Sequence, residues 1–232
     1  MTFTHCDDTK HFFRDLKRVN LNETRYYSVE DTFYPSVTSV ISFINREKCA
    51  GWRARVGDEE ANRKTKHATT RGTKCHKLWE VYIDNGDYKA LPEWENPLCQ
   101  LMFQASKFYL DTRIDNIYHQ ETTMSSDKLC LAGTVDLICE VDGELSIVDF
   151  KTSGREKPEE WLEDYFVQLS AYWAMFSERT GVVPRKLVVF LVAEDGTVQI
   201  VERRNIMKYL MTLRDYANQF IEFRDAGSKR TQ

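Results

Sequence analysis

Three features that would point to familiar classes of protein are missing from this sequence. Its six cysteines include no CxxC pair, which argues against a zinc site or a dithiol redox motif. No apolar run approaches the length of a membrane span, so no transmembrane helix is predicted. The formal net charge is −4, which gives the chain as a whole no electrostatic attraction for nucleic acid. The sequence also contains no internal repeat and no low-complexity segment.

The first ten residues likewise lack the marks of a targeting signal. They contain no apolar core and carry Asp7 and Asp8, which argues against a secretory or mitochondrial leader and predicts a cytoplasmic protein. In a reducing compartment the cysteines are expected to be free thiols. The sequence is 42% hydrophobic and 29% charged, which predicts a globular protein. Its 232 residues suit one large domain, or a domain with a helical extension.

The most informative stretch, residues 133–153, holds two short apolar-rich runs joined by an Asp-Gly pair. Such a pair between alternating apolar residues is typical of a tight β-hairpin. Asp149 and Lys151 are two residues apart, so their side chains leave the same face of the second strand. A hairpin that turns at residues 142–143 puts Asp136 opposite Asp149. Two carboxylates and a lysine would then form one patch able to hold a divalent metal beside a phosphate. Ordinary polar residues on a solvated sheet face would give the same pattern.

Residues 52–77 form a second distinctive segment because of their charge. They contain eight basic and three acidic residues, a local balance of +5 in a chain of net charge −4. A solvated helix face is one interpretation. A surface that meets the phosphates of a nucleic acid is the other, and the contrast with the rest of the chain favours it. Arg71 and Lys74 are the candidates for contacts with such a substrate.

Apolar spacing and turn signals outline the other elements. Gly72 is expected to end a helix in the basic segment, with a new helix starting near Thr73. The other expected helices cover residues 37–45 after a cap at Ser36, residues 98–115, a segment from Pro158 to Gly181, and residues 205–225. An edge strand is expected at 117–126, and a second hairpin turning at 195–196 contains a central apolar strand. Residues 1–34 are expected to be irregular. The total is about five strands and five or six helices.

Two pairs of residues lie four apart on expected helices and so share a helix face. They are His76 with Glu80, and Gln168 with Tyr172. A lone histidine on a helix is more often structural than a metal ligand, and Gln168 and Tyr172 are compatible with a surface amide and a packed ring. Taken alone, neither pair indicates a function.

The order of these motifs resembles that of the PD-(D/E)xK nuclease superfamily. The matching pieces are His76, Gly133-x-x-Asp136, Asp149-x-Lys151 and Gln168-x-x-x-Tyr172, within about residues 34–223. The sequence is similar to the RecB-like exonuclease branch, which carries a histidine on an upstream helix and a QxxxY pair after the lysine. Within that branch it looks most similar to the mitochondrial genome maintenance exonuclease and its viral and bacterial relatives. No single piece is specific to the superfamily. Four pieces in the right order, on the right elements, are strong evidence together.

This resemblance implies an α/β fold with a restriction-endonuclease-like core, a central mixed sheet of about five strands flanked by helices. The expected division of the chain has three parts. They are an N-terminal extension with a helical basic segment (1–70), a nuclease core (71–226) and a frayed tail (227–232).

The resemblance also implies a site for Mg²⁺ or Mn²⁺. Asp136, Asp149, the carbonyl of Phe150 and His76 would be its ligands. The nitrogen donor of His76 tilts the preference toward Mn²⁺ without excluding Mg²⁺. Lys151 would position or deprotonate the attacking water and stabilise developing negative charge, which makes Asp136, Asp149 and Lys151 the expected catalytic group.

Further implied contacts are with the substrate or with the ligands. Gln168 and Tyr172 would hold Lys151 and the substrate backbone. Hydrogen bonds to phosphate are expected from Thr152 and Ser153. Glu121 and Glu80 are weaker candidates, expected to orient the metal ligands without binding the metal themselves.

Two departures from the branch narrow the expected function. No cysteine follows Cys139, so the iron-sulfur cluster of several RecB-like nucleases is not expected, and the absence of a Walker motif predicts a free-standing nuclease. We predict a metal-dependent DNA exonuclease that favours single-stranded DNA with free ends and has no membrane partner. The alternatives are a duplex-resecting exonuclease or structure-specific endonuclease on the same core, and a nucleic-acid-binding module that has lost catalysis.

Overall fold

A mixed sheet of five strands forms the centre of the computed structural model, which describes residues 2–21 and 24–228. The strand order is β4-β5-β6-β7-β8, with β6 and β7 parallel and the other neighbours antiparallel. The strands are β4 (Ile114–Ser126), β5 (Leu131–Val141), β6 (Glu144–Ser153), β7 (Lys186–Ala193) and β8 (Val198–Arg203). The predicted mixed sheet is therefore confirmed, with β4 at its edge as expected.

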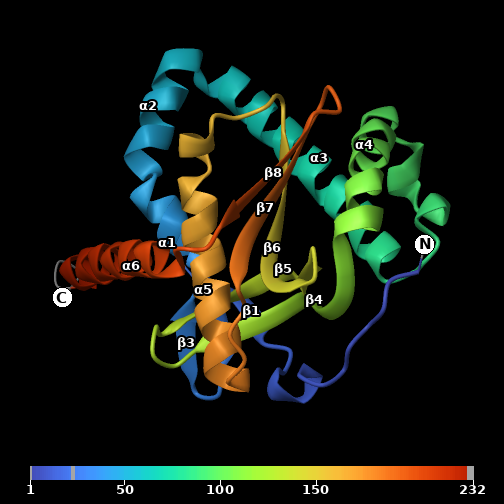
Figure 1. Cartoon of the computed structure of the whole chain (residues 1–232). Helices are drawn as coiled ribbons and strands as arrows, with labels where there is room; N and C mark the ends of the chain where they lie inside the picture. The colour runs from blue at the N-terminus through green and yellow to red at the C-terminus, as the bar shows by residue number, and fades with distance from the viewer. Residues whose placement is uncertain (1, 22–23, 229–232) are drawn as a thin grey trace.

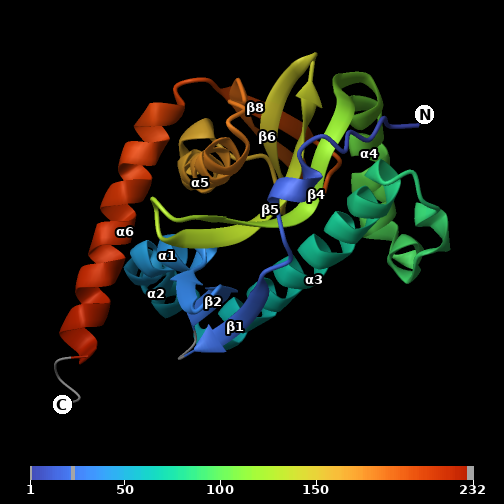
Figure 2. The same cartoon turned by 90° about the horizontal axis from the view of Figure 1, so that it is seen from below.

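Helices cover both faces of this sheet (Figures 1 and 2). One face packs against α3 (Asp58–Ile83) and α4 (Pro97–Arg113). The opposite face packs against α1 (Val37–Ile44), α5 (Glu163–Thr180) and α6 (Ile206–Ser228). A further helix, α2 (Arg46–Val56), connects α1 to α3. Short 3₁₀ turns lie at Lys10–Phe12, Tyr88–Ala90, Pro92–Glu95 and Glu159–Trp161. The last of these follows Pro158, where the sequence predicted the first turn of α5.

Strand β7 shows why an apolar run marks the middle of the sheet. All eight of its residues are buried. Leu187, Val189 and Leu191 pack with the core under α5, whereas the residues between them pack with the core under α3 and α4. Because successive side chains of a strand point to opposite faces, a run that is apolar at every position, as residues 187–193 are, indicates a strand covered on both faces.

The N-terminal segment contradicts the prediction of an irregular lead-in. It forms a separate three-stranded antiparallel sheet of β1 (Lys17–Leu21), β2 (Thr24–Val29) and β3 (Thr32–Pro35). Most of its side chains are exposed or half-buried, so its strands have no clear apolar period to detect. Its anchor is Tyr27, which is buried and shares a 3.0 Å hydrogen bond between its Oη and Thr134 Oγ1 of β5.

The sequence predicted that Gly72 ends a helix, and this prediction is wrong. Helix α3 continues through Gly72, from residue 58 to residue 83. A glycine inside a helix costs about 1 kcal/mol relative to alanine, but here it faces β6. A Cβ at Gly72 would lie 3.5 Å from Thr152 Oγ1. The close packing of α3 on the sheet therefore outweighs the local preference, and α3 crosses the expected division at residues 70–71.

At the other end of the chain, α6 extends to Ser228, into the part expected to be a frayed tail. Residues 229–232 of that tail lie outside the described residues. Among the helices that the structure describes, none combines the length and the apolar character needed to span a membrane.

Candidate active site

Three carboxylates lie at the same level on neighbouring strands of the sheet. The β5–β6 hairpin turns at Asp142-Gly143 as predicted, with Leu137 paired to Val148, so the next positions are Asp136 and Asp149. On the other side of β5, the pairs Gln120–Leu137 and Thr122–Val135 bracket Glu121 and Asp136. The register of two strand pairs thus aligns Glu121, Asp136 and Asp149 across the sheet.

The sheet opens at this level, because β5 and β6 stop pairing after Leu137 and Val148. From Asp149 onward β6 pairs only with β7. The main-chain N–H of Phe150 has lost a partner on β5 and donates instead to Asp136 Oδ2, at 2.8 Å. This hydrogen bond holds the Asp136 carboxylate in the fork between the two strands, where a ligand can reach it.

A histidine on α3 completes a group of potential metal ligands. One ligand atom each from His76, Glu121 and Asp136 lie within 4.8 Å of one another, and His76 Nδ1 is 3.7 Å from Asp136 Oδ2. Glu121 has a positive φ of 46°, an uncommon backbone conformation for a residue with a side chain. Such local strain is typical of functional positions. Glu121 therefore lies beside Asp136 among the potential ligands, and not behind them as the sequence suggested.

The electrostatics of these residues fit a bound cation. Burial raises the pKa of Glu121 to about 8, and the charges of Asp136 and Glu80 add to the shift. Burial also raises the pKa of Asp136, and it raises that of Asp149 to about 6. Burial, followed by the charge of Lys151, lowers the pKa of His76, so its imidazole is neutral and able to act as a ligand. Crowded carboxylates beside a neutral histidine are a suitable donor set for a divalent cation, which would relieve their repulsion.

Asp149 is held by two partners, Lys151, which the sequence placed beside it, and Gln168, which the sequence did not. Its Oδ2 lies 2.5 Å from Lys151 Nζ, and its Oδ1 accepts a 3.0 Å hydrogen bond from Gln168 Nε2. Gln168 also donates to Tyr172 Oη at 3.3 Å. The sequence predicted that Gln168 and Tyr172 hold Lys151. In the structure the amide of Gln168 instead donates its hydrogen bond to Asp149.

Lys151 itself lies beside an aromatic ring that the sequence did not single out. Its Nζ is 5.1 Å from the centroid of Tyr165, a residue at the start of α5. Burial works against the charged form of Lys151, but the carboxylates of Asp149 and Asp136 raise its pKa above the ordinary value. The lysine is therefore a protonated donor in this arrangement. The sequence did not indicate this contact, because nothing local relates Tyr165 to Lys151.

Gly133 has a role that its place in the motif did not explain. A Cβ at this position would lie 2.7 Å from Tyr172 Cε1, far inside van der Waals contact. The ring of Tyr172 is buried against the bare main chain of β5. Gly133 thus leaves room for the ring whose hydroxyl accepts the hydrogen bond of Gln168.

The remaining candidate residues border the site in different ways. Arg71 is buried and forms an ion pair with Glu194, so its guanidinium is engaged inside the protein. Lys74 lines a pocket of about 370 Å³ between α3 and the start of α4. Thr152 lies against Gly72, and Ser153 is buried with its carbonyl accepting from the N–H of Glu194 at 3.0 Å.

Glu80 is further from the potential ligands than Glu121. Its carboxylate pairs with Lys77 at 2.9 Å, and its carbonyl accepts a 2.7 Å hydrogen bond from Gln120 Nε2. It influences the site through its charge, since it contributes to the raised pKa of Glu121.

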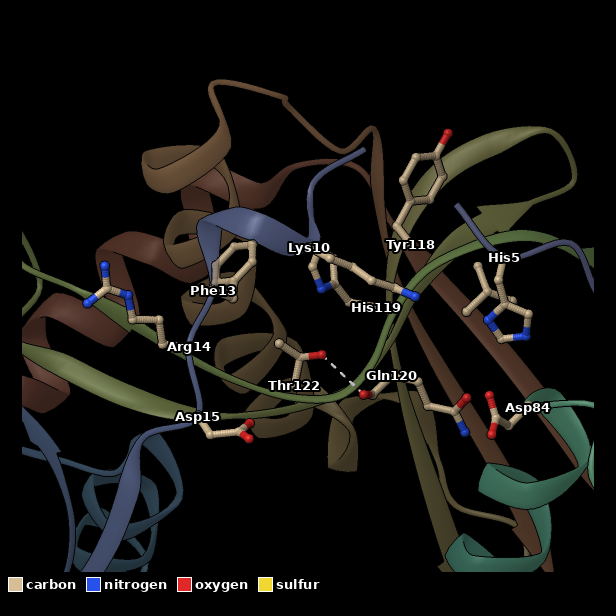
Figure 3. A pocket seen from close by; sticks show the side chains of 11 residues that line it. His5, Lys10, Phe13, Arg14, Asp15, Asp84, Tyr118, His119, Gln120 and Thr122 are labelled. Carbon is tan, nitrogen blue, oxygen red and sulfur yellow. Dashed lines mark hydrogen bonds between the residues drawn. The ribbon is translucent and has the colours of Figure 1, made fainter. Parts of the chain in front are cut away.

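A polar pocket of about 290 Å³ lies behind Glu121, where the N-terminal segment runs along the edge of β4 (Figure 3). The segment is tied to the strand at both ends, through Cys6 N–H to the Ile117 carbonyl and through Leu16 N–H to Thr123 Oγ1. In Figure 3 Gln120 and Asp84 point toward one another at one end of the pocket. The sequence missed this pocket because it assigned no structure to the residues that cover the edge strand.

The family model described as the PD-(D/E)XK nuclease superfamily matches residues 52–225, about three quarters of the chain. That range contains His76, Glu121, the β5–β6 hairpin and the Gln168–Tyr172 pair. No curated protein matches the sequence. The five-stranded mixed sheet with helices on both faces agrees with the restriction-endonuclease-like fold that the motifs implied.

Proposed function

Because the chain belongs to the PD-(D/E)XK nuclease superfamily, we propose that it is a metal-dependent DNA exonuclease of the RecB-like branch, acting on single-stranded DNA with free ends. Membership of the superfamily implies a metal-dependent nuclease. The observation that carries the metal-dependent chemistry is the meeting of His76, Glu121 and Asp136 beside the Asp149–Lys151 pair.

The protein's own donors would hold Mg²⁺ or Mn²⁺ at the fork between β5 and β6. Asp136, Glu121 and His76 are the ligands that the geometry favours, with Asp149 and the carbonyl of Phe150 next to them. A divalent cation bound there supplies a lowered pKa for a bound water and charge compensation for the phosphate under attack. The neutral imidazole of His76 is the reason to expect Mn²⁺ to serve at least as well as Mg²⁺.

Lys151 acts in this proposal as a charged donor. The carboxylates around it favour its ammonium form, so it is suited to orient a water and to stabilise negative charge on the phosphate oxygens in the transition state. Asp149 fixes its position through the ion pair, and Gln168 fixes Asp149 in turn. This chain of contacts reaches from the core of α5 to the reacting group and keeps the ammonium in one place.

The choice of DNA with free ends rests on the resemblance to the RecB-like branch and on the basic surface of α3. Lys66 and Lys74 line the same pocket, and no ion pair engages either lysine among the residues that the structure describes. Such cations are available to the phosphates of a strand. A duplex-resecting exonuclease and a structure-specific endonuclease would use the same metal site, so the substrate has to be determined by experiment.

A substrate comparison tests the proposal directly. The purified protein is incubated with end-labelled linear single-stranded DNA, linear duplex DNA and circular single-stranded DNA, each with Mg²⁺, with Mn²⁺ and with EDTA. We expect metal-dependent degradation of the linear single strand and protection of the circle. Cleavage of the circle would show an endonuclease, preferred cleavage of the duplex would show a resecting enzyme, and binding without turnover in either metal would show a catalytically silent module.

A further inference from the structure

A pocket of about 560 Å³ opens next to the proposed active site, where α1 and α2 meet the loop before α5. Its wall includes Trp161, whose side chain is 59% exposed. Exposure of an indole ring to water is unfavourable, so tryptophan side chains are usually buried. Exposed tryptophans are enriched at binding surfaces. A cavity of this volume is in the range that holds a small organic ligand.

Most of the acidic residues of the pocket have partners of their own. Glu163 is paired with Lys208 at 2.6 Å, and Asp164 accepts hydrogen bonds from Asn45 and Tyr216. Two of the three acids on the wall are thus engaged by partners, and Glu160 is the third. Lys48 and Lys157 supply the positive charge.

Lys157 connects this pocket to the reacting lysine. Its Nζ lies 2.8 Å from Tyr165 Oη, and both Lys157 Nζ and Lys151 Nζ are 5.1 Å from the centroid of the Tyr165 ring. The two ammonium groups are therefore at most about 10 Å apart. At the roughly 3.4 Å rise of a stacked strand, that distance spans no more than about three nucleotides.

We infer that this pocket binds an unpaired nucleotide of the substrate close to the scissile bond, with its base stacked on Trp161 and its phosphate on Lys157. The inference rests on the proposed function and names the aromatic side chain that would select single-stranded DNA. A base can lie flat on the indole only when it has left its complementary strand, so a duplex cannot use the site. Stacking on an aromatic ring accepts any base, which suits an enzyme without sequence preference.

Binding of oligothymidylate with metal omitted tests the inference without relying on turnover. The ring of Trp161 is worth about a 5- to 150-fold change in affinity if it stacks on one base. We expect Trp161→Ala to weaken binding by that factor and Trp161→Phe to retain most of the affinity while losing quenching of tryptophan fluorescence. Phe108→Ala is the matched control, because Phe108 is 67% exposed but lies on α4, on the other face of the sheet.

A series of oligonucleotides with one abasic position each distinguishes stacking from a structural effect. At the position over Trp161 the missing base should weaken binding to the wild-type protein about as much as Trp161→Ala does, and should add nothing to that variant. Lys157→Gln should lower the slope of log affinity against log salt by about 0.7, the value for one phosphate contact of a single strand. Equal affinities of Trp161→Ala, Phe108→Ala and the wild type, or additive effects at every abasic position, would overturn the inference. Absence of cleavage by the wild type would instead reject the proposed nuclease function, because binding is measured separately.

Discussion

The Asp136 carboxylate accepts a 2.8 Å hydrogen bond from the main-chain N–H of Phe150, the residue between Asp149 and Lys151. This contact exists because β5 and β6 separate at that level and leave the amide without a strand partner. One interruption of the sheet thereby creates the space for a cation and fixes the carboxylate that faces it. The predictions below test the residues around that fork.

Removal of the Lys151 ammonium should stop the reaction and leave the fold intact. We expect Lys151→Ala to lower the rate of oligonucleotide degradation by roughly 10²- to 10⁴-fold, the range of a positioned donor or acid-base group. The side chain ends beside Asp149 and Tyr165 and carries little of the core, so circular dichroism and thermal unfolding should change little. Lys107→Ala, which removes a lysine that pairs with Asp111 on α4, should retain turnover. A wild-type rate for Lys151→Ala would remove this residue from the mechanism.

Glu121 should contribute directly to metal affinity. Glu121→Gln keeps the size of the side chain but removes a charge that lies within 4.8 Å of the ligand atoms of His76 and Asp136. We expect the affinity for Mn²⁺, measured by calorimetry, to fall by about 10- to 100-fold. Glu80→Gln is the matched control, since Glu80 pairs with Lys77, and its effect should be smaller. Equal effects of the two substitutions would place both glutamates outside the ligand set.

Gly133 should tolerate no side chain. The Cβ of Gly133→Ala would lie 2.7 Å from Tyr172 Cε1, so the buried ring or the strand must shift. We expect a loss of about 1–3 kcal/mol in the free energy of unfolding, as for other overpacked cores. Gly154→Ala is the control, because a Cβ there meets nothing within 4 Å. Urea denaturation at pH 7 measures both variants, and equal midpoints would show that the ring adapts at no cost.

Stability should fall on mild acidification because of His119. This side chain is buried against Phe13 and Phe176 and bonds to Thr9 Oγ1 at 2.8 Å. Burial lowers the pKa of His119 to about 4, below its value of 6.5 in the unfolded chain. The unfolded state therefore binds the extra proton between about pH 6.5 and pH 4, and stability is lost as the pH falls through that window.

The comparison that isolates His119 uses His119→Gln. From pH 7 to pH 5 the wild type should lose about 2 kcal/mol more of unfolding free energy than the variant, by proton linkage. Urea titrations of both proteins at both pH values supply the four unfolding free energies. Parallel losses in the two proteins would show that His119 does not determine the acid sensitivity.

The basic face of α3 should set the salt dependence of DNA binding. Lys66 and Lys74 line one pocket, and reversing both charges should weaken binding of single-stranded DNA by at least about 10-fold at low salt. The slope of log affinity against log salt should fall by about 0.7 for each lost phosphate contact. Lys64→Glu is the control on the same helix, because Lys64 pairs with Glu60. An unchanged slope in the double variant would exclude this face from the path of the strand.

Local chemistry in the sequence was enough to predict the hairpin and its register. An Asp-Gly turn and alternating apolar residues determine how β5 and β6 pair, and this aligns Asp136 with Asp149. The apolar run of residues 187–193 in β7 likewise indicated its central position, because burial on both faces favours apolar side chains at every position of the run. The motif order indicated the family, which the family model also supports.

Other features depend on contacts between segments far apart in the chain. Gly72 stays inside α3 because the helix packs closely on β6, a tertiary contact that outweighs helix propensity. Glu121 reaches the ligand group through the pairing of β4 with β5 and through a positive φ, neither of which its neighbours in sequence reveal. The side chains of the sheet of residues 17–35 are mostly exposed or half-buried, so the strands have no clear apolar period.

The sequence by itself thus determined which groups could perform the chemistry and which of them share a strand or a helix face, because these follow from the periods of local structure. Only the tertiary structure decided their partners. It put Gln168 on Asp149 and Tyr165 beside Lys151, and it opened the fork at Asp136. The physical reason is that the packing of α3 and α5 against the sheet, and the point at which two strands separate, depend on contacts between different elements, which the periods of local structure do not encode.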